Sequence, residues 1–302
     1  MKTLVNFKGI VLFHMVKCGG TTLNYIFRNN FSSNFRQVWP LEGKTDNFGR
    51  AICSDSDLLK FISQDTKAIT GHGIRPAFNL FSDQVTKVIF LRDPISRFFS
   101  HHNHWINRPK NKSVQFDKEI TRRLGDFQEH NYMVNFIAGE SNLDMAKEIL
   151  REFDFVGILE DFDTSLHIMK KEIIPNFNTG YRIENKGNKS SYLNSQTASK
   201  YIKDKVRECN DLDLKLYEFA KSEFSQSFES FTHTLKPSPA VKTDNKESFS
   251  WNTFSLLRFR LRKVFDQYAK RPNFRRCNCS RVIESKEKSQ CNYCDVNSIN
   301  AT

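Results

Sequence analysis

A pair of glycines stands between a short apolar run and an amphipathic helix pattern near the start of the chain. The run Gly9–His14 predicts a buried strand, and Thr21–Asn29 predicts a helix with its apolar residues on one face. Gly19 and Gly20 allow the backbone to approach a ligand closely and to turn several N–H groups toward one anion. The helix that follows adds the partial positive charge of its N-terminus. This order of strand, loop and helix predicts an anion-binding turn in an α/β protein.

The side chains of the same turn suit a phosphate or a sulfate. Lys17 supplies a mobile cation, and Thr21 and Thr22 supply hydroxyl donors. The turn is not a Walker A motif, because Lys17 precedes the glycines and no Gly-Lys-Ser/Thr ends the loop. A tight strand-to-helix turn that uses glycine only for its geometry is the alternative interpretation.

Strands and helices are expected to alternate along the first 230 residues or so of the chain. Further short strands are predicted at Ile52–Cys53, Lys67–Thr70, Lys87–Leu91 and Phe153–Leu159. Helices are predicted from Pro94, over 117–124, 127–138, 142–151 and Phe162–Ile174, and once or twice within Thr197–Phe231, with a polar loop over 178–196. This pattern predicts an α/β fold of three layers, α/β/α, with a central and mainly parallel sheet.

A second motif runs from Lys87 to Trp105. Arg92 follows a predicted strand, at the end of the sheet where ligands gather in open α/β folds. Ser100 lies eight residues later, about two helical turns on, so both side chains could bind one phosphate. Arg97 could join them or pair with Asp93. A structural ion pair and an ordinary helical serine are the alternatives.

Together the two motifs resemble the donor-binding motifs of sulfotransferases that use 3′-phosphoadenosine 5′-phosphosulfate (PAPS). The carbohydrate branch of that family reads approximately hIPKTGGTT and hhRDPhxRhxSxY at these places. The segments Phe155–Ile173 and Asn210–Ala220 are similar to later parts of the family, so the resemblance covers about residues 8–232. Within the branch, heparan and uronyl 2-O-sulfotransferases are the most similar.

This resemblance implies a P-loop-NTPase-like sulfotransferase fold, PAPS as co-substrate, and no required metal. It implies that Lys17 contacts the sulfate and the bridging oxygen. It assigns the 5′-phosphosulfate to Lys17, Cys18, Gly19, Gly20, Thr21 and Thr22, and the 3′-phosphate to Arg92 and Ser100. Cys18 stands where the family has Thr or Ser, and Val16 replaces a proline, which would loosen the turn slightly.

The acceptor hydroxyl must lose a proton, and a histidine near neutrality is the natural base. His72, between Gly71 and Gly73 after a predicted strand, is the expected base, since the similar 2-O-sulfotransferases carry theirs in such a segment. A histidine in an ordinary turn is the alternative, and Glu160 is the second candidate. Lys186, in the polar loop, is expected to close over the donor, unless that loop is simply solvated.

Other histidines near these motifs are expected to have no catalytic role. His101 and His104 would share one face of a helix and His102 would not, which does not match a metal site. An acceptor-facing or solvated surface is the favoured interpretation. His14 is expected to pack in the core at the end of its strand.

Composition and charge restrict the class of protein more than the activity. With 38% hydrophobic and 26% charged residues the chain can form a globular core. The formal net charge of +12 favours anionic partners, among which a glycan is preferred and no nucleic acid is expected. No segment approaches the length of a membrane span and no signal peptide is recognised, so a cytoplasmic location with reduced cysteines is expected.

The C-terminal part is expected to be separate from a sulfotransferase domain over 1–235. A polar linker is expected over 236–248, and the tail covers 249–302. The basic, amphipathic stretch 249–271 would cover the core or a partner, or lie on an anionic membrane surface. Zinc ligands are conceivable at Cys277, Cys279, Cys291 and Cys294; free thiols are the alternative.

The leading hypothesis is therefore a transferase that moves a sulfuryl group from PAPS to a hydroxyl, most plausibly of a carbohydrate. A nucleotide-dependent phosphotransferase is the second hypothesis, weakened by the absence of a Walker A pattern. A non-catalytic module that binds PAPS, its spent product PAP or a polyanion is the third.

Overall fold

The computed structural model describes residues 7–78, 80–81, 84–106, 116–125, 129–181 and 198–234. The expected donor-loop residue Lys186, the linker 236–248, the basic stretch 249–271 and the four tail cysteines lie outside these ranges. The expectations for them stay predictions.

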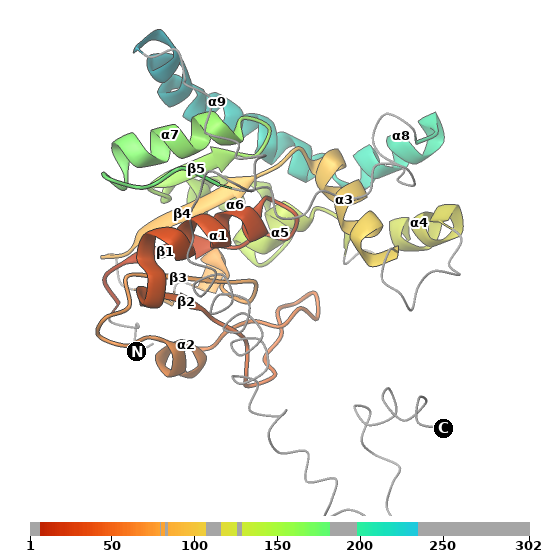
Figure 1. The fold of residues 1–302 in the computed structure, drawn as a ribbon. Coiled ribbons are helices and arrows are strands. Elements are labelled where there is room, and N and C mark those ends of the chain that lie inside the picture. The colour runs from red at the N-terminus through yellow and green to blue at the C-terminus, as the bar shows by residue number, and fades with distance from the viewer. Residues whose placement is uncertain are drawn as a thin grey trace, which may run out of the picture. The chain divides into compact units, whose positions relative to one another are not determined.

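A sheet of five parallel strands forms the centre of the fold (Figure 1). Its strands are β1 (Ile10–Phe13), β2 (Phe35–Gln37), β3 (Ala68–Gly71), β4 (Thr86–Leu91) and β5 (Phe155–Ile158). Their order across the sheet is β2-β3-β1-β4-β5, and every paired neighbour is parallel. The chain passes from β1 to one side of the sheet and reaches the other side only with β4. Ligands bind open α/β sheets at such a reversal, beyond the carboxyl ends of the strands.

Helices cover both faces of this sheet. In chain order they are α1 (Gly20–Phe31), α2 (Asp55–Phe61), α3 (Pro94–Ile106), α4 (Phe116–Leu124), α5 (Tyr132–Ala138), α6 (Leu143–Arg151), α7 (Phe162–Glu172), α8 (Lys200–Cys209) and α9 (Asp211–Thr234), with short 3₁₀ turns at Ser32–Asn34 and Pro76–Phe78.

Alternate residues of each strand face opposite layers. Leu12, Val88 and Phe90 pack with α1 and α7 in one apolar core. Val11 and Ile89 pack with α2, α5, α6 and α9 in the other. The α/β/α architecture with a parallel central sheet is therefore confirmed.

A third apolar cluster lies away from the sheet. Phe98 and Phe99 of α3 pack there with Ile120 of α4 and with Ile202 and Val206 of α8. Figure 1 shows these three helices together, beyond the end of the sheet. Since α3 begins directly after β4, this cluster fixes the direction in which the second motif leaves the sheet.

One predicted strand was wrong, one strand was not anticipated, and one helix begins later than expected. Ile52–Cys53 is not a strand: the Ile52 N–H donates to the Lys44 carbonyl and the Cys53 N–H to the Gly73 carbonyl, so both bond to loops. Strand β2, over Phe35–Gln37, was not anticipated, because three residues are too few for a periodic signal. The helix expected from 127 begins at Tyr132, after Asn131 in the left-handed region (φ 45°).

Asp213 joins α9 to α5. Its side chain is fully buried and accepts hydrogen bonds from the N–H groups of Met133 (2.9 Å) and Val134 (2.8 Å). These N–H groups belong to the first turn of α5, which has no intrahelical acceptor for them. The carboxylate therefore caps α5 from another helix and holds Tyr132 in place.

We expect Asp213→Asn to lower the free energy of unfolding by about 1–3 kcal/mol, since an amide has one acceptor oxygen and leaves a buried N–H unpaired. Asp211→Asn is the matched control: Asp211 lies two residues earlier, is exposed and pairs with Lys215. It should change stability by less than about 0.5 kcal/mol. Urea denaturation of both variants measures the difference, and equal losses would contradict the capping role.

Candidate functional site

The turn between β1 and α1 requires its glycines. Gly19 adopts φ 79°, and a β-carbon there would stand 2.7 Å from Cδ1 of Leu159. At Gly20 an added β-carbon would stand 1.6 Å from Nε2 of His14, so the imidazole ring occupies that space. Lys17 also has a positive φ of 68°, which is uncommon for a residue with a side chain. The turn is thus a specific backbone conformation.

The N-terminus of α1 has an anion-binding character. No side chain caps it, and its first turn contains no acidic residue. The first intrahelical bond runs from the Leu23 N–H to the Gly19 carbonyl (3.0 Å), so the preceding N–H groups of Gly20, Thr21 and Thr22 have no acceptor within the helix. The Cys18 N–H instead donates to the Met15 carbonyl (3.4 Å). The backbone N–H of Cys18, one of the expected donors to the 5′-phosphosulfate, is therefore already bonded within the turn.

Arg92 and Lys17 meet at this turn. Nη1 of Arg92 donates to the backbone carbonyl of Lys17 (3.2 Å) across 75 residues of sequence. Burial, and then the Arg92 charge, lower the pKa of Lys17. Ser100 lies half-buried on α3, and its sharing of a phosphate with Arg92 stays a prediction.

His72 lies directly after β3 and contacts His14, which follows β1. The two rings are 3.9 Å apart between centroids, and Nδ1 of His72 lies 3.1 Å from the His14 carbonyl oxygen. Because a carbonyl only accepts, Nδ1 of His72 must carry the proton, and Nε2 of the neutral ring keeps its lone pair. Burial lowers the pKa of His72; the bond to the His14 backbone partly opposes this, and Arg75 adds to it. The structure thus favours a neutral ring with a basic Nε2.

The expectation for His14 was only partly right. Its ring is half-buried, covers Gly20, and lies against the ring of His72 at an angle of 36°. Burial and then the neighbouring His72 place the pKa of His14 well below its usual value. Its position directly before the glycine turn was the sequence signal that could have placed it at the site.

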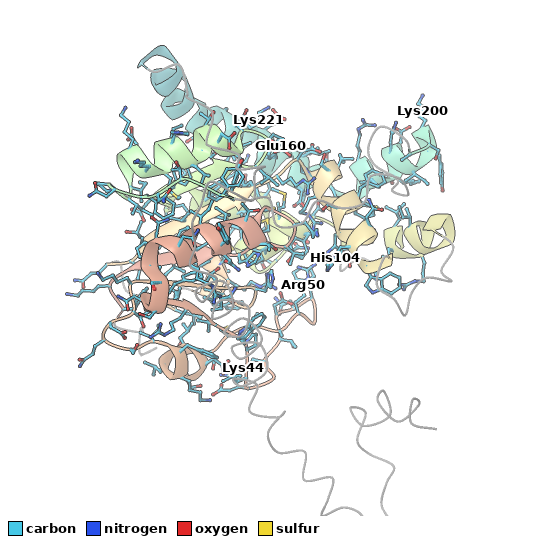
Figure 2. The ribbon with its side chains drawn as sticks, in the orientation of Figure 1. Lys44, Arg50, His104, Glu160, Lys200 and Lys221 are labelled. Carbon is cyan, nitrogen blue, oxygen red and sulfur yellow. The ribbon has the colours of Figure 1, made fainter. Side chains whose placement is uncertain are left out.

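Glu160, the second candidate base, is occupied by structural contacts. Oε1 accepts from the Asp93 N–H (3.1 Å), and Oε2 accepts from the Tyr217 hydroxyl (2.8 Å). Figure 2 labels Glu160 after β5, near α9. Since both oxygens hold neighbouring segments, this carboxylate fits a bracing role better than that of a base.

The histidines of α3 differ from the expected surface group. His102 is buried (1% exposed) and its ring lies 4.0 Å from that of Phe98, while His101 is half-buried near Glu129 and only His104 is exposed. Burial, followed by His101, lowers the pKa of His102 to about 2. His102 is therefore a neutral core residue.

Cys18 and Asp93, two further side chains near the turn, have structural surroundings. Cys18 is buried, and this burial raises the pKa of its thiol to about 12, so it is not a nucleophile at neutral pH. Asp93 does not pair with Arg97: Oδ1 of Asp93 accepts from the Ser96 N–H (2.7 Å) and caps α3. Arg97 is instead completely buried.

The described part of the chain holds neither a metal-binding cluster nor a membrane-spanning helix. No group of three or more His, Cys, Asp or Glu side chains there is arranged to hold a metal ion. No helix within those residues is long and apolar enough to cross a bilayer.

Three comparisons relate this chain to known proteins. A profile described as "Sulfotransferase family" matches residues 5–220. An uncharacterized protein of Archaeoglobus fulgidus is 24% identical over 255 residues, which is 72% of this chain and 97% of that protein. The crystal structure of a sulfotransferase from Alicyclobacillus acidocaldarius aligns with 76% of this chain and 97% of its own, at 11% identity and a TM-score of 0.38.

The burial of His102 predicts a specific loss of stability in acid. In the unfolded chain a histidine binds its proton near pH 6.5, whereas His102 in the folded protein does so only near pH 2. Between these values the unfolded state binds more protons, so stability falls as the pH falls. The slope from this one group is about 1.4 kcal/mol per pH unit below about pH 6.

His102→Gln removes the titrating group. Between pH 7 and pH 5, we expect the free energy of unfolding to fall by about 2 kcal/mol less in this variant than in the parent protein. His104→Gln on the same helix is the control, because it removes an exposed imidazole in place of the buried one. Denaturant titrations at both pH values measure this. An unchanged slope in His102→Gln would contradict the buried neutral state.

Proposed function

Since this chain belongs to the sulfotransferase family, we propose that it transfers the sulfuryl group of PAPS to a hydroxyl of an acceptor, with a carbohydrate as the acceptor. The observation that carries this proposal is the uncapped N-terminus of α1, with Lys17 and Arg92 held at the same turn. Three N–H groups, a helix dipole and two cations suit the 5′-phosphosulfate of such a donor.

Lys17 acts on the leaving group in this proposal. Transfer breaks the bond between sulfur and the bridging oxygen, and negative charge develops on the departing 5′-phosphate of PAP. A preorganised cation and N–H groups at that place stabilise the transition state more than the ground state. The lowered pKa of Lys17 makes its ammonium a better hydrogen-bond donor to that oxygen.

His72 receives the proton of the acceptor. The acceptor oxygen forms a new bond to sulfur, in line with the breaking bond, and its proton passes to Nε2 of His72. The Nδ1–H donated to the His14 carbonyl fixes the tautomer and orients the ring. The carbohydrate acceptor is supported by the resemblance of the motifs to the carbohydrate branch.

The first test removes the cation at the turn. Lys17→Ala should reduce kcat with labelled PAPS roughly 10²–10³-fold, as expected for loss of one transition-state donor. Lys60→Ala, an exposed lysine at the end of α2, is the control and should keep full activity. If the parent protein transfers sulfate and Lys17→Ala does so at the same rate, this mechanism is ruled out. The absence of any transfer and of PAP binding in the parent protein would rule out the function itself.

The second test separates the base from the donor site. His72→Gln should lower kcat roughly 10²–10⁴-fold, since no group then accepts the proton. Its affinity for PAP, measured by calorimetry, should stay within about twofold of the parent value, because His72 acts on the acceptor. His167→Gln on α7 is the control: Nδ1 of His167 lies 2.7 Å from the Asp163 carbonyl. If kcat is undiminished in His72→Gln, a group other than His72 accepts the proton of the acceptor hydroxyl.

A further inference from the structure

The loop between β5 and α7 contacts both donor motifs. On one side it meets the donor turn (residues 17–22), because a β-carbon added at Gly19 would stand only 2.7 Å from Cδ1 of Leu159. On the other side it meets the second motif, because Oε1 of the exposed Glu160 accepts from the Asp93 N–H (3.1 Å; Figure 2 labels Glu160). Two consecutive residues of this loop therefore touch the two segments that form the proposed donor site.

These contacts fix the backbone of Arg92 on both sides. The carbonyl of the preceding residue, Leu91, accepts from the Leu159 N–H (2.9 Å), and the N–H of the following residue, Asp93, donates to Glu160. The ladder between β4 and β5 ends at Leu91, so the carboxylate continues the pairing beyond the end of the strand. From this position Nη1 of Arg92 reaches a backbone carbonyl of the donor turn (3.2 Å).

Tyr217 of α9 holds the carboxylate itself. Its hydroxyl donates to Oε2 of Glu160 (2.8 Å), and its side chain is 5% exposed. Both carboxylate oxygens thus have a donor, one from the loop after β4 and one from α9. Hydrogen bonds to a charged acceptor are stronger than those between neutral groups. Glu160 is therefore held in place although the residue is exposed.

The negative charge of Glu160 by itself opposes the binding of an anionic donor. Burial raises the pKa of the Cys18 thiol to about 12, and Glu160 contributes to this rise, so its charge reaches the donor turn. A carboxylate there repels a phosphosulfate, although solvent screens an exposed group. Charge alone thus predicts that loss of Glu160 strengthens donor binding. Loss of a group that holds Arg92 in place predicts the opposite.

We propose that Glu160 is a positioning residue for the donor: it fixes the Asp93 peptide, and with it Arg92, in the place from which the guanidinium binds the nucleotide. This inference rests on the proposed function, which places the donor at Lys17 and Arg92. Glu160 acts through Arg92, and Tyr217 holds Glu160 in turn. Preorganisation of this kind increases affinity, because the guanidinium does not have to be ordered when the nucleotide binds.

The first comparison separates the hydrogen bond from the charge. Glu160→Ala removes both. Glu160→Gln removes only the charge, because its amide oxygen still accepts from the Asp93 N–H and its NH₂ group faces the Tyr217 hydroxyl, which also accepts. Calorimetry on the full chain measures the affinity for PAP. Glu160→Ala should weaken PAP binding about five- to twentyfold, whereas Glu160→Gln should stay within about threefold of the parent value.

A double-mutant cycle tests whether Glu160 acts through Arg92. Arg92→Met should weaken PAP binding about tenfold or more, because it removes a charged donor. In that background Glu160→Ala should weaken binding by less than about a further twofold, since no guanidinium is left to position. Glu172→Ala is the matched control, because Glu172 is an exposed glutamate at the opposite end of α7. It should keep the parental affinity.

A third variant keeps the test valid if Glu160→Ala does not fold, which thermal unfolding shows. Tyr217→Phe retains the buried ring and removes the donor to Oε2 of Glu160. It should weaken PAP binding about two- to fivefold, and this loss should disappear in the Arg92→Met background.

Several results would overturn the positioning role. They are parental PAP affinity in Glu160→Ala, an equal loss in Glu160→Gln, and full additivity with Arg92→Met. A kcat that falls about 100-fold in Glu160→Gln with parental PAP affinity would instead make Glu160 the base. If the parent protein binds no PAP, the proposed function fails and this inference with it. PAP binding that Glu160→Ala leaves unchanged contradicts only the inference.

Discussion

The parallel register of the central strands is the constraint on which the site depends. Phe13 at the end of β1 lies opposite Gly71 of β3 on one side and Ile89 of β4 on the other. Because the strands run in one direction, the loops that leave their carboxyl ends must emerge at one edge of the sheet. Arg92 therefore meets Lys17, and His72 meets His14, although the chain separates each pair by tens of residues. The hydrogen bond from Arg92 to the Lys17 carbonyl joins two of these loops directly.

Some buried polar and charged groups oppose stability. His102 is held neutral in the core, and the N–H groups of Arg75 and Arg97 lack acceptors among the described residues. Each of these features costs free energy that an apolar residue of similar size would not. Arg75 and Arg97 lie against the rings of α5, whereas His102 packs on Phe98 of α3.

Much of the fold and of the donor turn followed from local patterns. The apolar runs predicted β1, β3, β4 and β5, because a strand buried on both faces has few polar residues. Lys17 and Arg92 were recognisable because glycines, strand ends and helix starts have local signatures. Strand β2 and the bonds of Ile52 and Cys53 were not predictable, since a three-residue strand is too short and those bonds reach distant loops.

The sequence alone thus determined the order of strand, glycine turn and helix, because these elements are neighbours along the chain. The tertiary structure decided which side chains surround that turn. It placed His14 against His72, occupied both oxygens of Glu160, and gathered Arg50, Arg75 and Arg97 around the rings of α5. Such contacts join residues with no fixed spacing in the sequence, so only the packed structure specifies them.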